Sequence, residues 1–234
     1  MDKKIRLLQV IPRLDVGGAE TGCKDIAQFI AKQNYFSAIL CSGGEQVKNI
    51  DQTKVKIFKF SVQSKNPFVI FFNIFVILFI VFFYKINIIH VRSRAPAWSC
   101  YFASKLLSVP LISTFHGTYN FNNPLKKFYN SVMLRGNSVI AGSRFIFEHI
   151  KNNYNYSKEI FLIPRGIDVN YFNPKNSSIE ELNSVRTRWG ISSNNFLILL
   201  PGRLTFWKGQ FLFLNTLLFL KEENLLNKIG RAHV

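Results

Sequence analysis

Short apolar runs alternate with longer stretches of helical character over the first two thirds of the chain. The runs are nearly free of polar residues, which is typical of strands buried on both faces of a parallel sheet. The predicted strands are residues 5–11, 36–41, 55–58, 86–91, 111–115, 138–141 and 160–163. The predicted helices are residues 19–32, 67–84, 96–107, 125–134 and 144–152. This alternation predicts an α/β domain with a doubly wound parallel sheet and right-handed crossovers over residues 1–165.

The pattern changes after Asp168. Turn-forming Asn, Pro and Ser residues surround one short helical stretch, residues 179–189, so residues 166–195 are expected to be an interdomain linker. A new apolar run at residues 196–200 and a turn plus helix at 202–220 predict the first βα unit of a second Rossmann-like domain over residues 196–228. This segment is much shorter than an ordinary domain of about 100–150 residues. Residues 229–234, IGRAHV, are the translation of a common sequencing adapter, and we expect them to be foreign to the protein.

The composition favours a globular protein with a basic surface. Hydrophobic residues make up 48% of the 234, and 30 Lys and Arg against 13 Asp and Glu give a net charge of +17. Disorder and a disulfide-stapled scaffold are excluded. The charge favours anionic partners such as phosphorylated small molecules, anionic lipid or nucleic acid, although the abundance of AT-codon residues offers a neutral explanation. Three cysteines without metal-ligand spacing and the absence of a secretory signal pattern predict a reducing, cytoplasmic setting.

Residues 68–84 are apolar except for Asn73. The stretch lies at the lower limit for a membrane-spanning helix, and a span would separate the strands on either side of it. Two interpretations remain open. The helix is either buried in the core, or it touches an anionic membrane surface from one side.

Glycine and polar residues follow several of the predicted strands. The carboxyl ends of parallel strands share one edge of the sheet, where ligands bind in open α/β folds. Glycines, helix N-termini and Arg or His at that edge suit a phosphate-bearing ligand. The residues concerned are Gly17, Gly18, Glu20, Arg92, Ser93, Arg94, His116, Gly117, Thr118, Gly142, Ser143, Arg144, Arg165, Gly166, Gly202 and Arg203.

Several other classes of site lack their motifs. The glycine loop VGGAETG is not the G-x-G-x-x-G dinucleotide fingerprint, which removes the main support for an NAD-dependent oxidoreductase. No P-loop, hydrolase elbow or metal-ligand spacing occurs, so no metal is expected. Aromatic residues at 119–123 beside Lys126 and Lys127 fit a loop over an acceptor site better than a nucleic-acid surface, and no nucleic-acid partner is expected.

Four segments resemble the retaining glycosyltransferases of family 4, which have the two-domain GT-B fold. They are residues 10–21 (VIPRLDVGGAET), 88–116 (IIHVRSRAPAW to STFH), 161–174 (FLIPRGIDVNYFNP) and 199–210 (LLPGRLTFWKGQ). The last is the most specific, since G-R-L followed by W-K-G opens the donor-binding domain of such enzymes. The resemblance implies transfer of a sugar from a nucleotide-sugar donor, with retention, to a glycan or lipid-linked acceptor in cell-surface glycan synthesis.

The resemblance also implies roles for individual residues. Gly17 and Gly18 would face the donor diphosphate, and His116 would be the catalytic residue that contacts the transferred sugar. Arg203 and Lys208 would bind the diphosphate and stabilise it as it leaves, without a metal or other cofactor. Further possible substrate contacts are Glu20, Arg94, Ser143 and Arg165.

Two departures from the family pattern affect these expectations. The family's E-x7-E carboxylate pair has no equivalent before residue 234, so this chain is expected to show little or no turnover. Arg165 stands where many relatives carry Asn. A non-catalytic module of the same fold, peripheral on the inner face of the plasma membrane, is the alternative interpretation.

Overall fold

Parallel strands joined by helices form the first part of the molecule. The computed structural model describes residues 4–119, 123–154, 156–192 and 197–225. The strands are β1 (Arg6–Val10), β2 (Phe36–Cys41), β3 (Val55–Lys59), β4 (Ile88–Val91), β5 (Leu111–Phe115), β6 (Ser138–Ala141) and β7 (Ile160–Leu162). They form a 7-stranded sheet in the order β3-β2-β1-β4-β5-β6-β7, and all neighbouring pairs are parallel. The predicted doubly wound α/β fold is confirmed.

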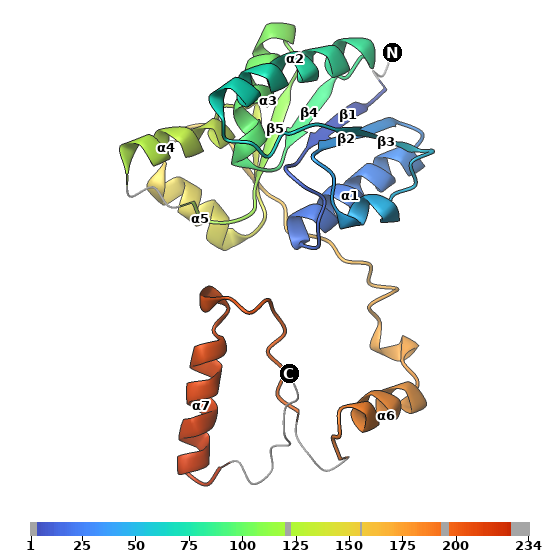
Figure 1. The fold of residues 1–234 in the computed structure, drawn as a ribbon, viewed down its shortest axis with the longest axis vertical. Coiled ribbons are helices and arrows are strands. Elements are labelled where there is room, and N and C mark those ends of the chain that lie inside the picture. Colours follow the sequence, from blue (N-terminus) through green and yellow to red (C-terminus); the bar gives the residue numbers. More distant parts are fainter. Residues whose placement is uncertain (1–3, 120–122, 155, 193–196, 226–234) are drawn as a thin grey trace. The chain divides into compact units, whose positions relative to one another are not determined.

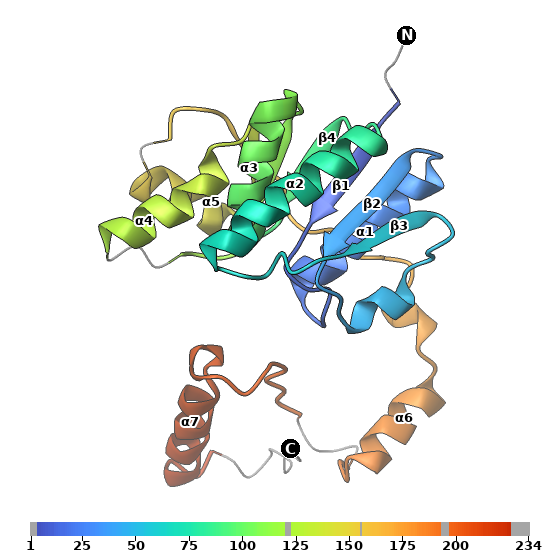
Figure 2. The same cartoon turned by 45° about the horizontal axis from the view of Figure 1, so that its top comes forward.

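Helices cover both faces of this sheet (Figures 1 and 2). They are α1 (Gly18–Lys32), α2 (Pro67–Phe83), α3 (Arg94–Leu107), α4 (Pro124–Ser131) and α5 (Arg144–Asn153), with short 3-10 helices η1 (Glu45–Asn49) and η2 (Val132–Leu134). On one face α1 packs against Ile39 and Cys41 of β2. On the other face α2 and α3 enclose the larger core with Leu8 and Ile89.

The strand order reverses between β1 and β4. The helix that follows β1 packs on one face of the sheet, and the helix that follows β4 packs on the other. Such a topological switch point leaves a crevice outside the carboxyl ends of the two strands. The fold therefore places the residues that follow β1 and β4 at the edge where a ligand is expected.

Helix α2 has one buried side and one exposed side. Val76, Ile77 and Ile80 are buried in the core, whereas all the phenylalanines of the helix point outward and each is at least 54% exposed. We call this row the phenylalanine stripe: Phe68, Phe71, Phe72, Phe75, Phe79, Phe82 and Phe83. Simple burial of the whole helix, one of the two open interpretations, is therefore excluded. Within the described residues, none of the helices has the length and apolar character needed to cross a bilayer.

The chain divides into two units, Met1–Arg165 and Gly166–Val234. The second contains η3 (Pro174–Asn176), α6 (Ile179–Arg188), η4 (Phe206–Lys208) and α7 (Gln210–Glu222). Helix α6 begins with a capping box, in which Ser178 and Glu181 each accept the other's backbone N–H.

The predicted strand at 196–200 is wrong for the residues that are described there. Leu197–Leu200 form no ladder and are exposed. A parallel strand needs hydrogen-bonding neighbours, and the described part of this unit contains no other strand to pair with it. Residues 229–234, the expected adapter-derived tail, lie outside the described residues.

The two sides of α2 give a stability prediction. Ile77→Ala should lower the free energy of unfolding by about 2–5 kcal/mol, because Ile77 is fully buried and its loss leaves a cavity. Phe79→Ala, one half-turn away, should cost less than about 1 kcal/mol, because Phe79 is 60% exposed. Urea unfolding followed by circular dichroism compares the two variants. Equal losses would contradict the assignment of the buried and exposed sides.

Candidate active site

A buried arginine lies at the switch point of the sheet. Arg92 is the first residue after β4, and its Nε donates a hydrogen bond to Oε1 of Gln9 at 2.8 Å. Gln9 is held in turn, because its Nε2 donates to the carbonyl of Cys23 in α1 at 2.8 Å. The Arg92 side chain is 5% exposed, and its Nη2 has no hydrogen-bond partner within the described part of the chain. A buried cationic donor without a partner is costly, which points to a ligand that supplies the acceptor.

Arg165 and His116 are in direct contact at the same edge. His116 follows β5, and Arg165 follows β7. Nη2 of Arg165 donates to Nδ1 of His116 at 3.0 Å. Because arginine can only donate, Nδ1 must be the acceptor and the imidazole must carry its proton on Nε2. That Nε2 is buried and has no acceptor among the described residues.

His116 is held in its neutral form. Burial lowers the pKa of His116 to about 3, and the nearby charges of Arg92 and Arg165 act in the same direction. At neutral pH the ring is therefore uncharged, and it cannot donate a proton as an imidazolium would. It can instead donate one hydrogen bond, from Nε2, to a hydroxyl or phosphate oxygen that enters the crevice.

Gly18 makes room for the Arg165 guanidinium. Helix α1 starts at Gly18, and no side chain caps its N-terminus at Gly17. A Cβ on residue 18 would collide with Nη1 of Arg165, and a Cβ on Gly17 would collide with the carboxylate of Glu20. Gly18, His116 and Arg165, three residues from distant parts of the sequence, thus lie together at one edge.

The electrostatics of this cluster favour an anion. Two guanidinium groups lie near the N-terminus of α1, where the helix macrodipole is also positive. The ion pairs found among the described residues are Arg13–Asp15, Lys54–Asp51 and Arg144–Glu148, and none of them neutralises this cluster. Glu20 is the carboxylate that approaches the glycine loop, and it lies over Gly17. A phosphate group would satisfy both the unused donors and the excess positive charge.

Two of the residues named from the sequence lie elsewhere. Arg94 donates to Oδ1 of Asn130 at 2.9 Å and stacks on Tyr119, with 4.1 Å between its Cζ and the ring centroid. Ser143 is the N-cap of α5, and its Oγ accepts the backbone N–H of Ile146 at 3.3 Å. This gives Ser143 a structural role at a helix end.

The remaining named residues, Arg203 and Lys208, lie in the second unit. Arg203 precedes η4 and Lys208 is its last residue, in the segment that precedes α7. The alkyl chain of Lys208 passes 3.8 Å from the position of a Cβ on Gly202, and Nε2 of Gln210 donates to the carbonyl of Arg203 at 3.0 Å. This loop brings the two cationic residues to the start of one helix, and their predicted role in diphosphate binding stays a prediction.

The sequence places both Arg92 and Arg94 at the edge of the sheet but predicts only Arg94 as a substrate contact. The usable signal is the alternation of side chains along a strand. Ile89 and Val91 pack into the larger core, whereas His90 bonds Thr114 of β5 on the opposite face, with 2.7 Å between Nε2 and Oγ1. Arg92 continues the side of His90, which is the side of α1. Within the described residues, no His, Cys, Asp and Glu side chains gather in a group that could hold a metal ion.

A Rossmann-like domain with a cationic crevice at its switch point defines a class of proteins that bind phosphorylated ligands. The chain belongs to glycosyltransferase family 4, whose family model matches residues 16–171. A search of curated protein sequences gave no match.

Three solved structures illustrate the likeness. A glycosyltransferase from Rickettsia africae ESF-5 shares 34% identity with a TM-score of 0.80, over 97% of this chain and 67% of that one. HepE from Anabaena, in complex with UDP and glucose, shares 19% identity with a TM-score of 0.72, over 91% of this chain and 57% of that one. Sucrose-phosphate synthase from Thermosynechococcus elongatus shares 11% identity with a TM-score of 0.72, over 98% and 71% of the two chains. The last two show the fold alone, and this chain spans 57–67% of the length of the first two.

Replacement of Arg165 should raise the pKa of His116. Arg165→Gln removes one of the two charges that disfavour the imidazolium, so the pKa should rise from about 3 yet stay below 6.5, because burial, its largest cause, remains. An NMR titration of histidine-labelled protein measures the change. Arg144→Gln is a matched control on α5, and it should leave His116 unchanged. A His116 pKa that ignores both substitutions would contradict the contact.

Proposed function

We propose that the chain is the acceptor-side domain, linker and first part of the donor-binding domain of a retaining glycosyltransferase. The enzyme transfers a sugar from a nucleotide-sugar donor to a glycan or lipid-linked acceptor in cell-surface glycan synthesis. The observation that carries this proposal is the contact of Arg165 with His116 against Gly18, beside Nη2 of Arg92, which lacks a partner among the described residues. HepE, which shares the fold, has been solved with UDP-glucose, and this supports the choice of donor class.

In the proposed transfer each of these residues has a separate role. The Nε2–H of neutral His116 would donate to a hydroxyl of the transferred sugar, an interaction that strengthens as charge develops in the transition state. Arg92, Arg165 and the N-terminus of α1 would attract the diphosphate side of the donor. Arg203 and Lys208 would stabilise the diphosphate as leaving group, so the proposal includes no metal and no other cofactor.

The proposal includes contact with a membrane through the phenylalanine stripe. Seven exposed aromatic side chains on one helix form an apolar surface of the kind that marks interaction sites. A helix with one face packed on its own domain and the other exposed can lie in the interface plane of a bilayer. The net charge of +17 would add attraction to an anionic leaflet. The enzyme would then act at the inner face of the plasma membrane.

Nucleoside diphosphate release tests the proposed reaction. The chain is expressed together with the coding sequence downstream of Lys228 and is given UDP-, GDP- and ADP-sugars. One nucleotide class should support transfer, whereas the 234-residue chain alone should show little or none, because it carries no E-x7-E pair. His116→Ala in the extended protein should lower kcat by about 100-fold, the usual loss for one transition-state donor.

His149→Ala, on α5, is the matched control and should retain the rate. Wild-type turnover by His116→Ala would remove His116 from the reaction. Absence of transfer from every nucleotide sugar by a folded, extended protein would overturn the proposed activity itself.

Co-sedimentation with vesicles tests the membrane contact. Phe75→Ser/Phe79→Ser should weaken binding to phosphatidylcholine vesicles with about one third phosphatidylglycerol by at least about tenfold, because each Phe contributes about 1.5–3 kcal/mol when buried. Phe145→Ser/Phe206→Ser removes two phenylalanines outside α2 that are even more exposed, and this variant should bind as the wild type does. Equal binding by both double variants would show that the phenylalanine stripe is not the contact.

A further inference from the structure

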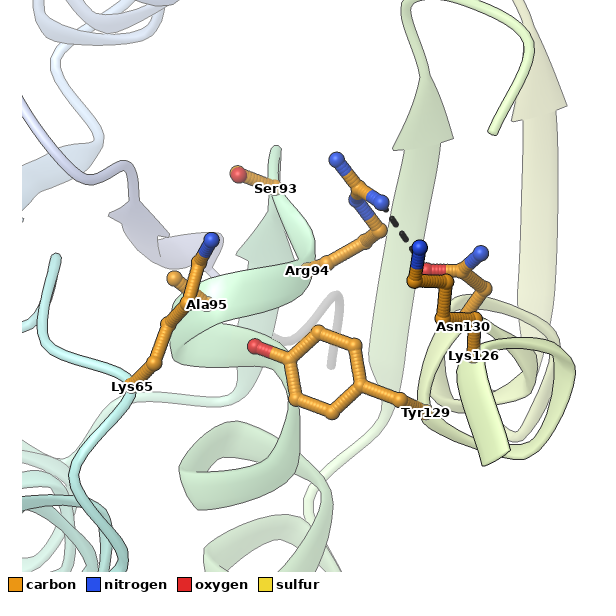
Figure 3. A pocket seen from close by; sticks show the side chains of 7 residues that line it. All are labelled: Lys65, Ser93, Arg94, Ala95, Lys126, Tyr129 and Asn130. Carbon is orange, nitrogen blue, oxygen red and sulfur yellow. Dashed lines mark hydrogen bonds between the residues drawn. The ribbon is translucent and has the colours of Figure 1, made fainter. Parts of the chain in front are cut away.

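A cationic cavity opens beside the end of β4, on the side away from Arg92. It has a volume of about 410 Å³ and is lined by Lys65, Ser93, Arg94, Ala95, Lys126, Tyr129 and Asn130. Figure 3 shows these side chains arriving from three directions: the segment before α2, the start of α3, and α4. The lining contains three cationic side chains and no carboxylate. We call this cavity the lysine–arginine pocket.

Several donors in the lysine–arginine pocket are unused. The Tyr129 hydroxyl, directed into it in Figure 3, is buried and has no hydrogen-bond partner among the described residues. Ser93 is the N-cap residue of α3, but its hydroxyl makes no capping hydrogen bond. Arg94 is held in place by Asn130 and Tyr119, which fixes its guanidinium at the pocket without neutralising it. These are the groups that a phosphate ester accepts hydrogen bonds from.

The sequence around the pocket carries positive charges and no negative ones. The stretch from Gln52 to Phe147 contains twelve lysines and arginines and no aspartate or glutamate. All of the residues that line the lysine–arginine pocket and the whole of α2, α3 and α4 fall within this stretch. An anion that approaches this part of the molecule meets no acidic side chain from the elements that form the pocket.

The phenylalanine stripe begins next to this pocket. Lys65 lies three residues before Phe68, and the 17 residues of α2 extend from there for roughly 25 Å. At the far end of the helix a second cavity of about 560 Å³ is lined mainly by apolar side chains, including Val81, Phe82 and Leu107. A cationic pocket, an apolar surface and a mainly apolar cavity thus follow one another along a single helix.

We propose that the lysine–arginine pocket binds the phosphate or diphosphate group of a lipid acceptor, whose hydrocarbon chain lies along the phenylalanine stripe. This inference rests on the proposed function, and it specifies the acceptor as an amphiphile with an anionic head. Lys65 and Lys126 supply mobile charge, and Arg94 supplies a fixed guanidinium fork. The site is distinct from the crevice, because Arg92 faces α1 whereas Arg94 faces α4.

Calorimetric titration of the 234-residue chain tests the site without requiring sugar transfer. The probes are farnesyl diphosphate, inorganic diphosphate and farnesol. Farnesyl diphosphate should bind at least about tenfold more tightly than either partial probe, because it alone presents both the anion and the apolar chain. Lys65→Gln/Lys126→Gln should weaken its binding by at least about tenfold. Phe75→Ser/Phe79→Ser should reduce it to the affinity of inorganic diphosphate.

Two controls isolate the site. Lys48→Gln/Lys127→Gln removes the same charge from residues outside the pocket lining, and it should bind as the wild type does. Arg165→Gln should also leave farnesyl diphosphate binding unchanged, which separates this pocket from the crevice. If sugar transfer fails while this pattern holds, the lipid site survives and the proposed enzyme activity does not.

Three results would overturn the inference. Equal affinity for inorganic diphosphate and farnesyl diphosphate would show an anion site without a lipid component. Unchanged binding by Lys65→Gln/Lys126→Gln would place the anion elsewhere. Loss of binding in Arg165→Gln alone would assign the probe to the crevice.

Discussion

The crevice depends on positive charge that no carboxylate of the described residues neutralises. The N-terminus of α1 and the guanidinium groups of Arg92 and Arg165 converge at the switch point of the sheet. Their mutual repulsion is tolerated because Gln9 holds one guanidinium and His116 accepts from the other. Burial, assisted by these two positive charges, keeps His116 neutral, and the position of Arg165 explains why residue 18 lacks a side chain. Each feature of the site thus follows from a surplus of donors that an anion would satisfy.

The fold of the first unit could be predicted from the sequence because its signals are local. Short apolar runs closed by Gly or Pro favour buried strands, and the helices between them favour parallel pairing. The strand predicted at 196–200 shows the limit of such reasoning. Its residues are as apolar as those of β4, yet a strand is stabilised by the neighbour it pairs with. The described part of the second unit supplies no such neighbour.

The site was predictable as a set but not in every member. The rule that ligands meet the carboxyl ends of strands brought Gly18, His116 and Arg165 together, since each follows a strand. The same rule could not separate Arg92 from Arg94, which follow the same strand two residues apart. Only the packing distinguishes the two residues. Arg92 contacts Gln9 on the side of α1, whereas Arg94 begins α3 and contacts Asn130. Ser143 also follows a strand, but its hydroxyl accepts a backbone hydrogen bond at the N-terminus of α5 and caps that helix.

Hydropathy alone does not show which side of helix α2 is buried. All of its residues but one are apolar, so no periodic pattern separates an inner from an outer side. Shape separates them instead: the branched aliphatic residues Val76, Ile77 and Ile80 fill the core, and the phenylalanines remain outside. An exposed aromatic surface of this extent is typical of a site that contacts another molecule or a membrane. In the proposed arrangement the end of β4 separates two anion sites, one at Arg92 on the α1 side and one at Arg94 beside α4. If the donor and the acceptor both carry phosphate, they would compete for the same cations at a single site, and the two proposed sites would remove that competition.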